Sequence, residues 1–190
     1  MEIDQDARSI PSRGRLLVAT PDLGDPNFDR TVVFLLEHSD EGTLGVVLNR
    51  PSETSVHEPL PAWVDHAAHP PVVFTGGPVA PSAAIGLACA GDDEVDGWAP
   101  LVGRLGTVDL ARTPGELLVT VERLRVFAGY GGWGAGQLDA EIAAGGWFVV
   151  DAWPDDAFSP YPERLWRTVL ARQRGRLAMF ANIPVDPSVN

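Results

Sequence analysis

Five glycines fall within residues 129–136, in the string Gly129-x-Gly131-x-x-Gly134 and just beyond it. That spacing matches the dinucleotide-binding fingerprint, in which backbone amides and a helix N-terminus hold a pyrophosphate. Three features count against such a site: the string lies late in the chain, Trp133 places a bulky side chain in the turn, and the helix expected after it is short. We therefore expect Trp133 to pack inward, and the glycines to serve unusual φ angles or close packing.

The chain offers little for metal or covalent chemistry. Residues 92–97 begin like an EF-hand loop, but the twelfth position is Gly103, where a bidentate glutamate is required. His66 and His69 are followed by two prolines, which disfavour a helix with both imidazoles on one face. Cys89 lies in an apolar run of small residues, which is typical of a buried thiol. We predict no catalytic residue, no metal site and no cofactor.

Composition narrows the function further. The 190 residues include 26 acidic residues and 14 arginines but no lysine, for a formal net charge of −12. Without lysine there is no Schiff-base or P-loop lysine. An acidic protein repels phosphate backbones, so we expect no direct binding of nucleic acid. A group of arginines near the C-terminus is the exception, either as a solvated helix face or as a patch for an anion or partner: Arg164, Arg167, Arg172, Arg174 and Arg176.

Features of export and membrane insertion are missing from the sequence. The single cysteine cannot form an internal disulfide. The N-terminal residues contain no apolar core of a signal peptide. The apolar runs are shorter than the roughly 18 residues that a membrane helix needs. We therefore expect a cytoplasmic protein with no membrane partner.

Apolar patterning predicts one α/β domain with a mixed sheet. Strands are expected at 15–19, 31–38, 43–49, 72–75, 85–88, 123–128 and 147–150, and helices near 62–67, 113–122, 137–144 and 161–174. Residues 31–49 should form a hairpin that turns at 39–42. With that turn, one face carries Val32, Phe34, Leu36, Gly45 and Val47, and the other carries Val33, Leu35, Leu44, Val46 and Leu48. Because both faces are apolar, we expect both to be covered.

These elements carry a series of short motifs: residues 14–20 (GRLLVAT), 25–31 (DPNFDRT), Glu37-His38, 45–51 (GVVLNRP), 76–79 (GGPV), 129–133 (GYGGW), 136–139 (GQLD) and Glu141. In this order they resemble the AlgH/YqgE proteins, a bacterial group with plant relatives. The resemblance covers nearly the whole chain. Gly131 departs from the family pattern, which usually has alanine there, so the middle glycine of the fingerprint is not a family feature.

The resemblance implies a fold and a compartment but no activity. It implies a single α/β domain over residues 14–180, with a mixed, twisted sheet partly closed into a small barrel and surrounded by helices. Tails would lie at 1–13 and 181–190, and the location would be cytosolic. Family members are often labelled transcriptional regulators, yet this chain shows no helix-turn-helix pattern.

Two functions remain open, and so does the oligomeric state. The first is a non-catalytic regulatory or binding module for a protein or small ligand. The second is a nucleotide- or anion-binding enzyme that uses residues 129–136 as a cradle; a concave pocket there would favour it, and a flat aromatic patch would favour the first. A structural hydrogen-bond network is the simpler role for the polar residues at the hairpin ends. The candidate binding surface consists of motif residues: Arg30, His38, Asn49, Arg50, Tyr130, Trp133 and Gln137.

Overall fold

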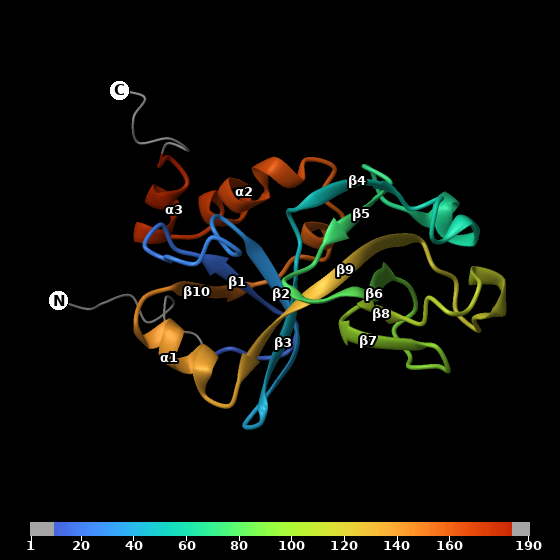
Figure 1. The fold of residues 1–190 in the computed structure, drawn as a ribbon, viewed down its shortest axis with the longest axis horizontal. Helices are drawn as coiled ribbons and strands as arrows, with labels where there is room; N and C mark the ends of the chain where they lie inside the picture. The colour runs from blue at the N-terminus through green and yellow to red at the C-terminus, as the bar shows by residue number, and fades with distance from the viewer. Residues whose placement is uncertain (1–9, 184–190) are drawn as a thin grey trace.

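A ten-stranded sheet runs through the computed structural model, which describes residues 10–183 (Figure 1). The strands are β1 (Arg15–Ala19), β2 (Val32–Ser39), β3 (Gly42–Val47), β4 (Pro51–Ser55), β5 (Val72–Thr75), β6 (Val79–Cys89), β7 (Trp98–Val102), β8 (Leu105–Val108), β9 (Arg123–Gly134) and β10 (Trp147–Asp151). Between and after them lie the 3₁₀ helices η2 (Pro61–His66), η3 (Pro114–Glu116), η4 (Pro154–Phe158) and η5 (Pro162–Arg164), and the α-helices α1 (Gln137–Ala143), α2 (Leu165–Ala171) and α3 (Arg176–Phe180).

The strand order shows how the sheet curls. The order is β10-β1-β2-β3-β9-β6-β8-β7, with β5 joined to β9 and β4 to β5. The β5–β9 pair is parallel and the other pairs are antiparallel, so the sheet is mixed, as predicted. Although β7 stands at one end of this order, Val102 packs against Gly14, just before β1: a Cβ on Gly14 would lie 2.1 Å from Val102 Cγ2. The sheet is therefore curled into a half-barrel.

Strand β9 is the spine of the fold and corrects the prediction of a glycine loop. Its 12 residues run through the glycine string to Gly134, pairing first with β5 and β6 and then with β3. This segment is a strand and not a loop. Its glycines and those at 76–77 allow the two backbones to approach each other closely. A Cβ on Gly76 would lie 2.2 Å from the oxygen of Gly129, and one on Gly77 would lie 2.2 Å from the carbonyl carbon of Tyr130. Close packing of chains explains the glycines at this crossing.

The β2–β3 hairpin forms as predicted near its turn, where His38 pairs with Thr43. A bulge between Leu35 and Glu37 then shifts the register, so that Phe34 faces Val46. This shift overturns part of the predicted pattern, because one inserted residue exchanges the two faces beyond it. Val46 and Leu48 lie on the face of Val32 and Phe34, whereas Val47 lies with Val33 and Leu35. Both faces are buried, as the two apolar stripes indicate.

Helices cover parts of the sheet rather than surround it, which corrects the expected architecture. Helices α2 and α3 lie over one side of the β10–β1–β2 half and α1 lies on the other side (Figure 1). On the α2 side, Leu165, Val169 and Leu177 join the largest hydrophobic cluster, while Leu138 of α1 joins the cluster behind the sheet. A third cluster, around Trp63 and Trp98, fills the outer side of β6 and β8.

Two of the predicted helices are shorter than expected. The segment 113–122 forms only η3, because β-branched Val119, Thr120 and Val121 follow it and favour extended backbone. The segment 161–174 divides into η5 and α2. Gly175 has a φ of +64°, which is incompatible with a continuous α-helix, and α3 starts after it. Residues 62–67 form the 3₁₀ helix η2, and 137–144 form α1 nearly as predicted.

The predicted tails fall largely outside the described residues: 1–9 of the N-terminal tail and 184–190 of the C-terminal tail. Within residues 10–183, no helix has the length and apolar character required to cross a membrane.

Candidate functional site

A cleft of about 670 Å³ opens beside β7 and β8, at the end of the sheet away from α1. Its apolar lining includes Val95, Trp98 and Val108. Its carboxylates come from Glu94 and Asp96 on the loop before β7 and from Asp109 after β8; Gly97, Ala99 and Thr107 complete it. The β7–β8 hairpin therefore brings together the carboxylates that precede β7 and follow β8.

A tight turn holds the loop that carries Glu94 and Asp96. The backbones of Val95 and Trp98 exchange two hydrogen bonds of 3.1 and 2.9 Å. Gly97 takes the left-handed conformation between them, with φ +85°. The indole of Trp98 is buried, and its Nε1 donates to the Gly91 oxygen at 3.0 Å. The carboxylates of the loop are thus carried on fixed backbone.

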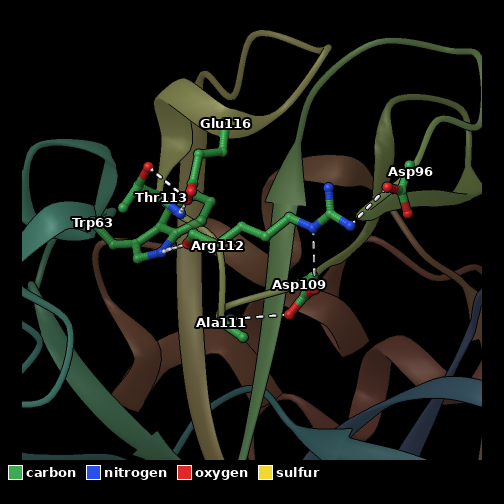
Figure 2. Close-up of polar contacts among 7 residues, drawn as sticks. All are labelled: Trp63, Asp96, Asp109, Ala111, Arg112, Thr113 and Glu116. Carbon is green, nitrogen blue, oxygen red and sulfur yellow. Dashed lines mark hydrogen bonds and ion pairs between the residues drawn. The ribbon is translucent and has the colours of Figure 1, made fainter.

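Arg112 ties the two sides of this cleft together (Figure 2). Its Nη2 lies 2.7 Å from Asp96 Oδ2 and its Nε lies 3.4 Å from Asp109 Oδ2. The lack of a side chain at Gly97 leaves room for the aliphatic part of the Arg112 side chain, since a Cβ at Gly97 would lie 3.0 Å from Arg112 Cδ. The hydrogen bond to Asp96, and then its charge, raise the pKa of Arg112. Asp109 in turn accepts the amide of Ala111 at 2.9 Å.

The backbone around Arg112 is held by a second set of contacts, also visible in Figure 2. The carbonyl of Arg112 accepts the indole N–H of buried Trp63 at 2.9 Å. Glu116 accepts both the amide of Thr113 at 2.6 Å and its hydroxyl at 2.9 Å. These two bonds, the amide first, lower the pKa of Glu116. These contacts hold the backbone at Arg112 and immediately after it.

The cleft carries a net negative charge. Three of its lining residues are carboxylates, and the adjacent Arg112 guanidinium contacts two of them. The exposed carboxylate of Glu94 makes no ion pair within residues 10–183. Among the same residues, no group of three or more histidine, cysteine or acidic side chains is arranged to hold a metal. The site suits a positively charged group that brings its own apolar surface.

The predicted residues Arg30, Asn49 and Arg50 meet elsewhere, at the end of β3. The side-chain oxygen Oδ1 of Asn49 accepts the backbone N–H of Val32 at 3.0 Å, and its Nδ2 donates to the backbone oxygen of Arg30 at 2.9 Å. Arg50 Nη2 donates to the oxygen of Asp29 at 3.0 Å. Together these bonds fix the loop before β2 against β3. They form the structural network that the sequence suggests.

Trp133 and Gln137 meet where α1 packs on the sheet. Trp133 is 5% exposed, which confirms that it packs inward. Its Nε1 donates to Glu141 Oε2 at 3.0 Å, and the same oxygen accepts the indole of Trp147 at 2.9 Å. Gln137 bridges the amide of Gly134 and Glu141 Oε1, both at 3.0 Å. These residues attach α1 to β9 and β10, and Trp133 offers little area to a ligand.

The remaining two predicted residues lie along β2 and β9. His38 Nδ1 is 2.7 Å from the hydroxyl of Thr43, across the hairpin. Tyr130 is half-buried and packs against the largest hydrophobic cluster.

The sequence prediction misses the cleft. It considers residues 92–97 only as an incomplete match to an EF-hand loop, although this loop supplies the cleft with Glu94 and Asp96. One signal was available: Asp109 and Arg112 stand three residues apart after a strand, a spacing suited to a local ion pair. That pair alone does not indicate which distant acidic loop it meets.

Fold and cleft together define the class of protein: a half-barrel domain with an open acidic cleft at one end. The chain belongs to the AlgH-like family, whose model matches residues 16–178. This confirms the predicted resemblance.

Relatives and solved structures agree with that assignment. The chain is 54% identical over 182 residues to a UPF0301 protein of Streptomyces coelicolor, covering 93% of this chain and 94% of the relative. It is 48% identical to a UPF0301 protein of Thermobifida fusca over the full length of both. The crystal structure of protein DIP2367 from Corynebacterium diphtheriae matches with a TM-score of 0.87 and 34% identity, covering 93% of this chain and 94% of that one. The solution structure of AlgH from Pseudomonas aeruginosa matches with a TM-score of 0.67 and 29% identity, covering 93% and 97%.

Proposed function

We propose that the chain is a cytoplasmic, non-catalytic binding module whose cleft beside β7 and β8 takes a positively charged segment of a partner protein. Regulation would then act through that partner, without direct contact with nucleic acid. The observation that carries the proposal is the Glu94 carboxylate, which stands without an ion pair of its own among residues 10–183 at the rim of a cleft with an apolar lining.

The chemistry of the lining supports binding by charge and apolar contact. An arginine or lysine side chain combines a cationic head with an aliphatic stem. The head would meet Glu94, and the stem would lie over Val95 and Val108, which line the cleft. Arg112 shows that a guanidinium fits this setting, since it already lies between Asp96 and Asp109.

The alternative of a nucleotide-binding enzyme at residues 129–136 finds less support. Residues Gly131 to Gly134 pair with β3, so this backbone lies within the sheet. The ring of Trp133 stacks on Phe28 at 5.5 Å and meets Trp147 edge-on at 5.9 Å. The indole also lies against Gly131, where a Cβ would be 3.0 Å from Trp133 Cη2.

Calorimetric titration with a short arginine-rich peptide tests the proposal, with a glutamine-rich peptide of equal length as the control ligand. We expect the arginine peptide to bind and the affinity to fall as salt rises. Glu94→Gln should weaken binding by about fivefold, on the order of 1 kcal/mol for an exposed ion pair. The matched variant Glu53→Gln, on the exposed side of β4, should bind like the wild type. Equal losses in the two variants would show only general attraction to an acidic protein and would reject the cleft as the site.

A further inference from the structure

A second surface lies apart from the cleft, over helices α2 and α3, which pack side by side (Figure 1). Arg167 of α2 reaches the end of α3, where its Nη2 donates to the Ile183 oxygen at 3.2 Å. Residues 160–183 hold five arginines and one acidic residue, Glu163, whereas the whole chain carries −12. Four of these arginines are exposed and define the α2–α3 surface: Arg164, Arg167, Arg174 and Arg176. This surface is therefore positive on an acidic protein.

Neighbouring carboxylates leave most of this positive charge unbalanced. Asp156 is buried, and its Oδ1 lies 2.6 Å from Nη1 of Arg172, the fifth arginine. Glu163 makes one long contact, of 3.8 Å, with the arginine that follows it. Arg174 and Arg176 form no ion pair with any of residues 10–183. Their guanidinium groups can therefore donate to a carboxylate of another molecule.

Large apolar side chains are exposed beside these arginines. Tyr161 is 60% exposed, and the guanidinium of Arg164 lies 5.5 Å from the centroid of its ring. Met179 of α3 is 70% exposed. Trp153 is 58% exposed, and its ring centroid lies 4.2 Å from the guanidinium of Arg172 at the end of α2. Because tryptophan, tyrosine, methionine and arginine are enriched in protein interfaces, this composition is typical of a docking site for a polypeptide.

We propose that the α2–α3 surface binds a short acidic segment of a partner protein. Carboxylates of that segment would pair with the exposed arginines, because a guanidinium can bind a carboxylate through two parallel N–H···O bonds. Apolar side chains of the same segment would cover Tyr161 and Met179. A two-fold pairing of this chain with a second copy centred here would set the positive surface against itself, so charge favours a different protein as the occupant.

The size of the surface favours a short segment over an extended polyanion. The seven residues of α2 span about 10 Å at the usual rise. The exposed carboxylates of Asp151 and Asp155 border the surface next to Trp153. A nucleic-acid duplex or an anionic bilayer extends beyond the arginines and would also meet these carboxylates and the acidic remainder of the chain. A short peptide segment can avoid both.

Fluorescence anisotropy with a short labelled peptide of glutamate and phenylalanine residues tests the proposal. The full chain should bind this peptide, and it should not bind the same peptide with glutamine in place of glutamate. Arg174→Gln should weaken binding by about threefold, as expected for one exposed ion pair. Arg104→Gln, in the turn between β7 and β8, removes the same charge and should bind like the wild type. Because the whole chain is acidic, general attraction does not explain such binding. A wild type that does not bind the glutamate peptide, or equal losses in the two variants, would overturn the proposal.

Two further measurements test the apolar contact and the class of partner. Tyr161→Ala should weaken binding of the same peptide, because the exposed ring supplies apolar area. Thermal melting checks that each variant folds. Duplex DNA, and vesicles of phosphatidylserine and phosphatidylcholine, should bind the wild type more weakly than the glutamate peptide does. Tighter binding of either one would reject a protein segment as the occupant, and an unchanged affinity for Tyr161→Ala would reject the apolar contact.

Discussion

The guanidinium carbon of Arg125 lies 4.2 Å from the centroid of the Phe74 ring, inside the largest hydrophobic cluster. Arg125 is 2% exposed, and burial lowers its pKa to about 10, so it remains a cation at neutral pH. Its hydrogen-bond acceptors are backbone oxygens, those of His69, Pro70, Ala157 and Ser159. Carbonyl dipoles and an aromatic face thus balance a buried charge, and one side chain on β9 holds two distant segments.

We expect Arg125→Met to lower the free energy of unfolding by about 2–4 kcal/mol. Methionine keeps much of the volume but removes all donors, which leaves buried carbonyl oxygens without partners. Urea unfolding measures the loss. Arg123→Met is the control, because the Arg123 side chain is 41% exposed and its pairing with Asp155 is a surface ion pair worth less than about 1 kcal/mol. Equal losses in the two variants would contradict a special role for Arg125.

The sequence predicts seven of the ten strands of this fold and misses β4, β7 and β8. Apolar and β-branched runs identify β1, the hairpin and β10, because a strand buried on both faces needs apolar side chains throughout. The bulge near Leu36 escapes prediction, since a period of two residues carries no sign of an inserted residue. The glycines of residues 129–134 are also ambiguous in sequence, because they are as typical of a loop as of a strand that packs closely against another backbone. In the structure they belong to β9.

The candidate site is less predictable because it depends on the β7–β8 hairpin, and the sequence prediction contains neither of these strands. The loop with Glu94 and Asp96 meets Asp109 and Arg112 only through the β7–β8 hairpin. No local pattern encodes that pairing. Motif residues such as Asn49 stand out in the sequence, yet the structure uses Asn49 to bind backbone.

Phe34→Ala should lower the free energy of unfolding by about 3–5 kcal/mol, as expected for a cavity in a packed core. Phe34 is 0% exposed and lies between Leu16 and Val46 on neighbouring strands, which confirms its predicted burial. Denaturant unfolding gives the value. Phe180→Ala, at a half-buried ring on α3, should cost clearly less. A loss below about 1 kcal/mol for Phe34→Ala would contradict the burial of both hairpin faces.

Glu116 should titrate below its ordinary value of 4.5, because the amide and hydroxyl of Thr113 stabilise its carboxylate. The pKa is lower in the folded protein than in the unfolded chain, so the contribution to stability is complete above the unfolded value. It is lost as pH falls through the folded value. Carboxyl chemical shifts in an NMR titration measure the pKa. Thr113→Val removes the hydroxyl and should raise it towards 4.5; an unchanged pKa would show that the hydroxyl contributes nothing.

The glycines at the crossing of β9 and residues 76–77 separate close packing from ligand binding. Gly76→Ala should destabilise the protein severely, because the new Cβ would lie 2.2 Å from the oxygen of Gly129, and backbone cannot yield as a side chain does. Gly132→Ala should be tolerated, since its Cβ would meet its nearest neighbour at 3.7 Å. Neither position has a positive φ, so the pair differs in space and not in backbone strain. Thermal melting ranks the two variants. The same melts with NAD or ATP should show no shift for the wild type, because Gly131 to Gly134 are paired within the sheet and the Trp133 indole lies against Gly131. Equal stability of the two alanine variants would reject the close-packing explanation of these glycines. A melting temperature that rises by several degrees with either nucleotide would reject it as well.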